Sequence, residues 1–283
     1  MDEVSVLQRN GLVRRGLLAG GAATGLTLAA ARVEAQTIAT DTEGLAVETI
    51  ALPVPGGSLP AYVARPRGHG PFPLILVNEE VFGLHHYIED VCRRLAKLGW
   101  MAIAPDVYAR GGDLGKISDM EKIFAIVAAT PDAQMLADLD RAVAWAGAHG
   151  GDTRRLGVLG FCRGGRAAWL YAEHSAVPRA AVAFYGPVNT RQTPVQPENP
   201  LTLASHLRCP LLGLYGAQDR SIAQADVAAA AAAARLAGQR VEIVVYPDAG
   251  HGFHADYRPS YVERDAEDGW RRALAWFRQY GVA

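Results

Sequence analysis

The chain has 283 residues, of which 50% are hydrophobic and 20% are charged, and its formal net charge is -1 at pH 7. This length and composition are sufficient for one large hydrophobic core, so we expect a single domain. The near balance of charge gives no basis for binding to nucleic acids or to anionic membranes. The three cysteines, Cys92, Cys162 and Cys209, are too few and too widely spaced for a disulfide scaffold or a Cys-x-x-Cys metal site.

Residues 1–35 are typical of an export signal. Arg14 and Arg15 precede an uncharged stretch rich in Ala, Gly, Leu and Thr, and Val33-Glu-Ala35 is a small-x-small cleavage site. The uncharged stretch is shorter than the roughly 20 apolar residues of a membrane span. Paired arginines before a weakly apolar core resemble a bacterial twin-arginine signal, which predicts cleavage before Gln36 and a periplasmic protein with no stable membrane association. The alternatives are an uncleaved signal that tethers the protein to the membrane, and a disordered tail.

The predicted mature domain, residues 36–283, begins with a hairpin and continues as an alternation of strands and helices. Residues 45–51 and 59–65 flank a Pro-Gly-Gly turn and favour two antiparallel strands. After the hairpin, apolar runs typical of buried strands alternate with amphipathic helical patterns. We predict strands at 73–77, 100–104, 155–160, 180–184, 211–215 and 241–246, and helices at 87–98, 136–148, 163–173, 226–236 and 266–280. This order predicts a single-domain α/β-hydrolase-type fold with a doubly wound, mostly parallel sheet.

One long segment, residues 186–206, interrupts this alternation. It contains four prolines and several polar residues and lies between two predicted strands. At the carboxyl edge of an α/β sheet, such a segment either borders the active site or is a surface excursion, and the pattern favours neither.

Cys162 lies in the segment Gly160-Phe-Cys-Arg-Gly164, between a predicted strand and a predicted helix. Small residues at such a junction are the context of a nucleophile elbow, in which a strained central residue projects from the sheet. A helix that begins at Arg163 would direct its amino end at the thiol and favour the thiolate. A cysteine in a single Gly-x-Cys-x-Gly match can also be an ordinary buried residue, so the assignment needs a base and a group that orients the base.

Asp219 and His251 supply these two groups in the order that the fold requires. Each follows a predicted strand, so both should lie with Cys162 at the carboxyl edge of the sheet. We therefore predict a triad with Cys162 as nucleophile, His251 as base and Asp219 as the orienting group. Asp226 and Asp248 are rival acids, but Asp226 falls inside the following helix and Asp248 is too close to His251 in sequence to come from a different strand.

These motifs resemble the dienelactone hydrolase family of α/β-hydrolases, which uses a Cys-Asp-His triad. The resemblance extends from about Leu45 to the C-terminus. It is carried by Glu80-Val-Phe-Gly83, Pro105-Asp-Val-Tyr-Ala-Arg110, Gly160-Phe-Cys-Arg-Gly-Gly165, Tyr215-Gly-Ala-Gln-Asp219 and His251-Gly-Phe253. It implies that Glu80 lies against the thiol and helps to control its ionisation. The oxyanion hole would then consist of the backbone N–H groups of Val81 and Arg163.

Substrate recognition departs from the family pattern. The family holds a substrate carboxylate with two arginines, one in the Pro-Asp-x-Tyr-Ala-Arg motif and one four residues after the catalytic histidine. Arg110 matches the first and is the expected substrate-binding residue, whereas Ala255 occupies the second position. Arg258 and His254 are candidates for the missing role, although each is equally compatible with an ordinary surface position. His85 and His86, which closely follow Glu80, are candidates for lining the pocket or for the start of a helix.

The sequence thus predicts a hydrolase that cleaves a carboxylic ester or lactone through an acyl-enzyme intermediate at Cys162, with no cofactor and no metal. The only partner it predicts is the small-molecule substrate. The alternatives are a broad carboxylesterase or thioesterase, a non-catalytic binding module with the same fold, and a redox thiol. The redox reading needs a resolving partner for Cys162, and Cys92 and Cys209 fall at expected core positions.

Overall fold

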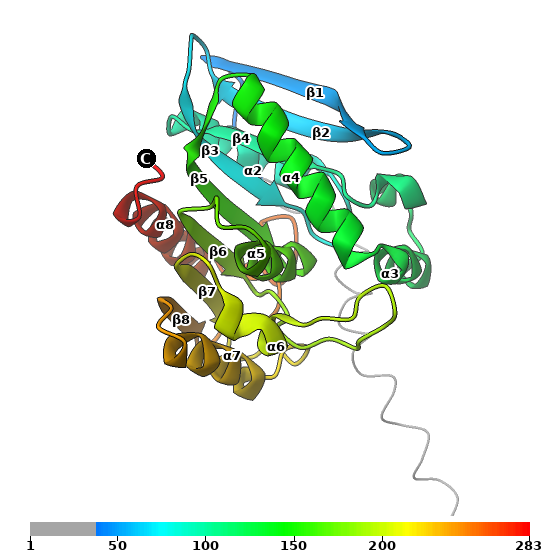
Figure 1. The fold of residues 1–283 in the computed structure, drawn as a ribbon, viewed down its shortest axis with the longest axis vertical. Helices are drawn as coiled ribbons and strands as arrows, with labels where there is room; N and C mark the ends of the chain where they lie inside the picture. The colour runs from blue at the N-terminus through cyan, green and yellow to red at the C-terminus, as the bar shows by residue number, and fades with distance from the viewer. Residues whose placement is uncertain (1–37) are drawn as a thin grey trace, which may run out of the picture.

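The computed structural model describes residues 38–283 (Figure 1). The predicted signal peptide, residues 1–35, and the cleavage site before Gln36 lie outside the described residues. In the part that the structure describes, no helix is both long enough and apolar enough to cross a membrane.

Eight strands form one sheet in the order β1-β2-β4-β3-β5-β6-β7-β8. At one end, β1 (Leu45–Val54) pairs antiparallel with β2 (Gly57–Pro66), and β2 pairs antiparallel with β4 (Met101–Pro105). The other pairings are all parallel, and they join β4 to β3 (Phe72–Asn78), β5 (Gly151–Phe161), β6 (Ala180–Phe184), β7 (Leu211–Gly216) and β8 (Val241–Tyr246). This topology confirms the predicted single-domain α/β-hydrolase fold with an N-terminal antiparallel hairpin.

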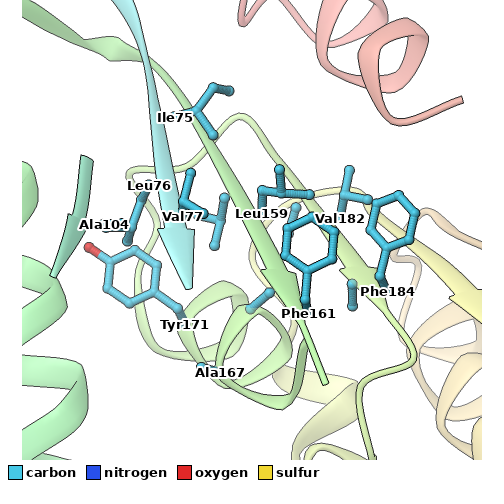
Figure 2. Packing of buried hydrophobic residues seen from close by; sticks show 14 of the residues in the cluster. Ile75, Leu76, Val77, Ala104, Leu159, Phe161, Ala167, Tyr171, Val182 and Phe184 are labelled. Carbon is cyan, nitrogen blue, oxygen red and sulfur yellow. The ribbon is translucent and has the colours of Figure 1, made fainter. Parts of the chain in front are cut away.

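Helices cover both faces of the sheet, and the core lies on both sides of it. On one face, α4 (Asp132–Ala148) and α5 (Arg163–His174) pack on β4, β5 and β6, and on the other α2 (His86–Lys97) and α8 (Glu263–Gln279) pack on the same sheet (Figure 1). The central strands are therefore buried on both faces, which is why they are continuous apolar runs in the sequence. Figure 2 shows side chains of β3, β5 and β6 packed side by side, with Ala167 and Tyr171 of α5 against them.

The segment between β4 and β5 contains more helix than the sequence pattern predicts. Two 3-10 turns, η1 (Ala109–Gly111) and η2 (Leu114–Lys116), precede helix α3 (Met120–Ala129). The next helix, α4, begins at Asp132 rather than at residue 136, where the sequence pattern predicts its start. Asp119 caps α3, because its side chain accepts hydrogen bonds from the backbone N–H groups of Glu121 and Lys122. An acidic residue before a short apolar helix was thus the signal that could have identified α3.

The long segment 186–206 is anchored to the helices beside it. It ends in α6 (Pro200–Leu203) and η3 (Ala204–His206), and Asn199 and Thr202 form a capping box at the start of α6. The buried side chain of Gln196 donates hydrogen bonds to the backbone carbonyls of Val127 and Thr130, at the end of α3. After β7, helix α7 (Gln224–Leu236) leads to the edge strand β8.

Candidate active site

Cys162 joins β5 directly to α5 with φ 53° and ψ -119°, a left-handed conformation that is strained for any residue with a Cβ. Two glycines permit the close approach of the chain around it. A Cβ on Gly160 would lie 1.9 Å from the carbonyl oxygen of Gly164, and a Cβ on Gly164 would lie 2.2 Å from the carbonyl oxygen of Asn78. The start of α5 therefore packs against the ends of β3 and β5, and this is the backbone geometry of a nucleophile elbow.

The side chains of Cys162, His251 and Asp219 form a continuous line of contacts. His251 Nε2 lies 3.1 Å from Cys162 Sγ, and His251 Nδ1 lies 2.7 Å from Asp219 Oδ2. The structure thus brings together the three residues that the sequence grouped, each from the end of its own strand. The rival acids lie elsewhere: Asp226 accepts a hydrogen bond from Asn189, and Asp248 pairs with Arg264 on the surface.

Ser221 is a site residue that the sequence reasoning missed. Its backbone N–H and its hydroxyl both donate to Asp219 Oδ1, at 2.8 Å and 2.6 Å. These bonds hold the Asp219 carboxylate so that its second oxygen faces His251. A serine two residues after an aspartate in a loop is a common turn pattern, and it is the signal that could have identified Ser221.

The charges around His251 favour its protonated form. Burial by itself would lower the pKa of His251, but the negative charge of an ionised Cys162 and the hydrogen bond to Asp219 outweigh it and raise that pKa to about 10. Burial would likewise raise the pKa of Asp219, whereas its hydrogen bonds with His251 and Ser221 lower the pKa overall. Asp219 therefore stays ionised as the partner of an imidazolium.

Val81 and Arg163, whose backbone N–H groups are the expected oxyanion hole, both lie at the pocket that contains Cys162. Val81 follows the end of β3, Arg163 is the first residue of α5, and both line the pocket that contains the thiol. Within residues 38–283, neither backbone N–H donates a hydrogen bond to another protein group. Neither N–H group is therefore occupied by a protein acceptor in the described residues.

Glu80, which the resemblance implies lies against the thiol, makes its hydrogen bonds with groups other than Cys162. It is completely buried, and its carboxylate accepts hydrogen bonds from Arg258 Nη2 at 2.9 Å and from the Tyr257 hydroxyl, with His85 Nε2 at 3.6 Å. Burial alone would raise the pKa of Glu80, but the Arg258 guanidinium and the hydrogen bonds lower it to about 2. A guanidinium is a stronger partner for a buried carboxylate than a thiol is.

Arg110, the expected substrate-binding residue, is not brought to the pocket. It donates two hydrogen bonds to the carboxylate of Asp138 on α4, at 2.6 Å and 3.0 Å, and it does not line the cavity. Ala255 is buried. His254 is also buried, with Nδ1 2.6 Å from the Tyr87 hydroxyl, and burial and the charge of Arg94 lower its pKa to about 3. Of the candidates, Arg258 donates to the Glu80 carboxylate and His85 lies 3.6 Å from it.

A pocket of about 330 Å³ opens over Cys162 and His251. The apolar part of its lining comes from Val81, Ile222 and the α3 residues Phe124, Val127 and Ala128. The lining also includes Arg163 and, from the 186–206 segment, Pro187, Thr190, Arg191 and Gln196. The long segment therefore borders the site, which is the first of the two readings that the sequence left open.

The remaining chemistry-bearing residues lie apart from this pocket. Cys92 in α2 and Cys209 before β7 are free, buried thiols, as expected of core residues, and burial raises their pKa values. Among the residues that the structure describes, no group of three or more His, Cys, Asp or Glu side chains is arranged to hold a metal ion. The expectation that the reaction needs no metal or cofactor stays a prediction.

Comparison with known proteins places the chain in a family. The profile of the "Dienelactone hydrolase family" matches residues 59–281. A protein of Methylorubrum extorquens named "Putative carboxymethylenebutenolidase" is 49% identical over 285 residues, covering 100% of this chain and 98% of that protein. A protein of Escherichia coli strain K12 with the same name is 46% identical, covering 91% of this chain and 96% of that protein.

A solved structure agrees with these sequence relatives. The crystal structure of a "Putative Dienelactone Hydrolase" from Klebsiella pneumoniae superposes with a TM-score of 0.81 at 48% sequence identity, covering 83% of this chain and 99% of that one. The chain therefore belongs to the dienelactone hydrolase family and is a carboxymethylenebutenolidase-like hydrolase.

Proposed function

We propose that the protein hydrolyses small carboxylic esters or lactones in two steps, with Cys162 as the nucleophile. The observation that carries this proposal is the line from Cys162 Sγ through His251 to Asp219, with 3.1 Å and 2.7 Å contacts, at a pocket that also presents the free N–H groups of Val81 and Arg163. Nucleophile, base, orienting group and oxyanion donors are thereby gathered around one point where a carbonyl carbon can bind.

In the first step, the thiolate of Cys162 attacks the carbonyl carbon and forms a C–S bond. The carbonyl oxygen becomes an oxyanion, which accepts hydrogen bonds from the backbone N–H groups of Val81 and Arg163. As the C–O bond to the leaving group breaks, the imidazolium of His251 donates its proton to the departing oxygen. The product is a thioester on Cys162, and in a lactone the leaving hydroxyl stays attached to the acyl group.

In the second step, neutral His251 accepts a proton from a water molecule as that water attacks the thioester. The tetrahedral intermediate expels the Cys162 thiolate and releases the carboxylic acid, which restores the thiolate and the imidazolium. Asp219 remains ionised throughout and keeps the imidazole in position. Because a thiolate leaves readily, lactones and activated esters suit this site better than amides.

Glu80 influences this site in two ways: through its ion pair with Arg258, and because it directly precedes Val81 in the chain. The Glu80–Arg258 ion pair keeps a guanidinium close enough to the thiol that the charge of Cys162 contributes, after those of Glu80 and Tyr257, to the raised pKa of Arg258. The same pair fixes the residue directly before Val81, whose N–H is the proposed oxyanion donor. In this proposal Glu80 is a positioning residue that also supports the ionised thiol.

The decisive test is turnover of a panel of dienelactone, simple lactones and aryl esters by the purified protein and by Cys162→Ala. We expect the variant to lose turnover and the native protein to form a thioester at Cys162 that mass spectrometry detects under rapid quenching. Full activity in Cys162→Ala would disprove the mechanism. A preference for open-chain esters over rings would favour a broad carboxylesterase or thioesterase, and a native protein that binds but never cleaves would be a binding module.

We also propose that residues 1–35 direct export through the twin-arginine route. The pattern of Arg14-Arg15, an uncharged core and Val33-Glu-Ala35 supports this proposal. N-terminal sequencing of protein from the periplasmic fraction should begin at Gln36, and replacement of both arginines by lysine should retain the precursor in the cytoplasm. An intact N-terminus in the periplasm, or a membrane-bound precursor, would contradict cleavage.

A further inference from the structure

Two consecutive glutamates that follow β3 differ in their partners. Glu80 pairs with the guanidinium of Arg258, whereas Glu79 is buried and forms no salt bridge within residues 38–283. Glu79 Oε1 accepts a hydrogen bond from the backbone N–H of Val107 at 3.0 Å, and Glu79 Oε2 has no donor beside it among the described residues. A buried carboxylate oxygen without a donor is costly, whereas a protonated one can itself donate a hydrogen bond.

A second carboxyl group lies beside Glu79. Asp106, which follows β4, is also buried. Burial, the charge of Asp106 and a hydrogen bond between the two side chains all raise the pKa of Glu79 well above its usual value. Burial raises the pKa of Asp106 as well, but the backbone N–H of Tyr108, 3.1 Å from Oδ1, and the hydrogen bond with Glu79 oppose that rise. A proton on Glu79 Oε2 gives Asp106 a donor and satisfies the oxygen that otherwise lacks a partner.

The charged groups on the neighbouring elements leave this pair without a cation. Asp113, which precedes η2, adds negative charge near Asp106. Tyr108 is buried, and burial raises its pKa, so its hydroxyl is neutral. The arginines of α5 and η1 have partners of their own: Arg163 with Gln196, Arg166 with Asp132 and Arg110 with Asp138. In the part of the chain that the structure describes, a shared proton is therefore what keeps the two carboxyl groups together.

The pair fastens the chain segment that carries the proposed oxyanion donor Val81. On one side of Val81, Glu79 binds the N–H of Val107. On the other side, a Cβ on Gly83 would lie 3.6 Å from Asp106 Oδ2, so the Asp106 carboxylate lies directly against that residue. The segment from Glu79 to Gly83 is thus held on both sides of Val81 by the loop that follows β4.

The surroundings of Glu79 leave little room for movement. The cavity between Glu79, Tyr108 and Gly164 has a volume of about 10 Å³, which is no more than one water molecule occupies. A Cβ on Gly164 would lie 2.4 Å from the carbonyl oxygen of Glu79, so the backbone of Glu79 packs against the start of α5. Gly164 is two residues after Cys162, and a displacement of Glu79 would therefore disturb the nucleophile elbow.

We propose that Glu79 and Asp106 act as one unit, a carboxylic acid hydrogen-bonded to a carboxylate, that positions the backbone N–H of Val81. This inference rests on the proposed hydrolysis at Cys162 and deepens it by assigning two positioning residues to the oxyanion hole. Glu79 acts in its neutral form, in contrast to the ionised Glu80 beside it. Because the oxyanion develops only after the thiolate has attacked, the pair affects kcat more than KM.

The first test compares two replacements of Glu79 in turnover of an aryl ester. Glutamine accepts from Val107, donates to Asp106 and cannot ionise, whereas leucine has a similar volume and does neither. We expect Glu79→Gln to keep kcat within about threefold of the native value, and Glu79→Leu to lose about tenfold to a hundredfold in kcat with KM changed by less than about threefold. Thermal unfolding shows whether each variant is folded.

Glu173→Gln is the matched control for a buried carboxyl group. Glu173 lies near the opposite end of α5 from Cys162, and neither of its side-chain oxygens has a hydrogen-bond partner among the described residues. Burial raises its pKa to about 9. Glu173→Gln should leave kcat unchanged.

The second test detects the proton on Glu79 without turnover. Infrared spectroscopy separates the C=O stretch of a carboxylic acid from the bands of a carboxylate. At pH 7, the spectrum of the native protein minus that of Glu79→Gln should contain an acid band, and the difference with Glu173→Gln provides a reference band for a buried acid. As the pH is raised, kcat of the native protein relative to Glu79→Gln should fall over the range in which the Glu79 band disappears, because two ionised carboxylates repel each other.

The outcomes separate this inference from the proposed mechanism. Absence of the acid band at pH 7, or a Glu79→Gln variant as impaired as Glu79→Leu, overturns the pair and leaves the hydrolase standing. A ratio of kcat values that does not follow the acid band contradicts the positioning role. Ester turnover that survives Cys162→Ala overturns the proposed mechanism, and the infrared band then decides by itself whether the protonated pair exists. If Glu79→Leu does not fold, Glu79→Gln and the infrared band still decide the proposal.

Discussion

Ser221 donates both its backbone N–H and its hydroxyl to one oxygen of Asp219, and the other oxygen of that carboxylate faces His251 Nδ1. The orientation of the base thus depends on a residue outside the triad. Removal of the hydroxyl in Ser221→Ala leaves the backbone hydrogen bond but frees the carboxylate to rotate. We expect kcat to fall by about tenfold to 150-fold, in line with the loss of about 1.5–3 kcal/mol for one hydrogen bond to a charged group. Ser221→Thr keeps the hydroxyl and is the matched control; equal losses in both variants would contradict the role of the hydroxyl.

The protonation of His251 should depend on the charge of Cys162. In the native protein the pKa of His251 is raised to about 10, and the charge of the ionised thiol is the largest of the contributions that raise it. Cys162→Ala removes that contribution while burial continues to favour the neutral ring, so the pKa of His251 should fall. Nuclear magnetic resonance of ¹³C-labelled histidine across pH 5 to 10.5 measures the shift. An unchanged titration in Cys162→Ala would show that the thiol and the imidazole are not coupled.

The buried Glu80–Arg258 pair predicts a specific dependence of stability on pH. The pKa of Glu80 is about 2 in the folded protein and about 4.5 when it is unfolded, so the pair contributes stability above pH 4.5 that is lost as the pH falls toward 2. Glu80→Gln leaves the guanidinium without its counter-ion, and we expect a loss of about 3 kcal/mol in the free energy of unfolding at pH 7.

The measurement for this prediction is urea unfolding of the native protein and Glu80→Gln at pH 7, 5, 4 and 3. The difference in the free energy of unfolding between the two proteins should shrink as the pH falls below 4.5. In that range Glu80 becomes protonated in the unfolded state of the unmutated protein, so the ion pair contributes less to stability. Glu48→Gln is the control, since Glu48 is exposed on β1. A difference that is constant over this range would mean that the pair contributes packing rather than charge.

Gly164 should tolerate no side chain. A Cβ at this position would lie 2.2 Å from the carbonyl oxygen of Asn78 and 2.4 Å from that of Glu79, and both are backbone atoms that cannot move aside cheaply. We expect Gly164→Ala to lower the free energy of unfolding by about 1–3 kcal/mol or more and to displace the Cys162 thiol. Chemical denaturation gives the first effect, and the rate of Cys162 alkylation reports the second. Gly250→Ala, with no atom within 4 Å of the added Cβ, is the control for stability.

The local order of elements was accessible from the sequence because it depends on short-range patterns. Apolar runs followed by loops place Cys162, Asp219 and His251 each after its own strand, and a parallel sheet collects strand ends at one edge. No knowledge of side-chain contacts is needed to group these three residues. In the structure His251 lies within hydrogen-bonding distance of both Cys162 and Asp219.

The partners of charged residues were not accessible in this way. Arg258 and Glu80 are 178 positions apart, and Arg110 meets Asp138 only because η1 packs near α4. A sequence shows that an arginine is present at a motif position, but which carboxylate neutralises it depends on the packing of distant elements. The same limit applies to the pocket wall, since α3 and the 186–206 segment contribute to it through contacts that no local pattern encodes.

The position of β8 at the edge of the sheet affects the order in which activity and structure are lost on heating. Cys162 follows β5 in the middle of the sheet, whereas His251 follows β8, which is hydrogen-bonded to β7 alone. An edge strand opens at a lower free energy than a central one. Opening of β8 would carry the base away from a nucleophile that stays in place. Heat inactivation should therefore precede loss of the core, and recover on cooling as long as the central strands remain paired.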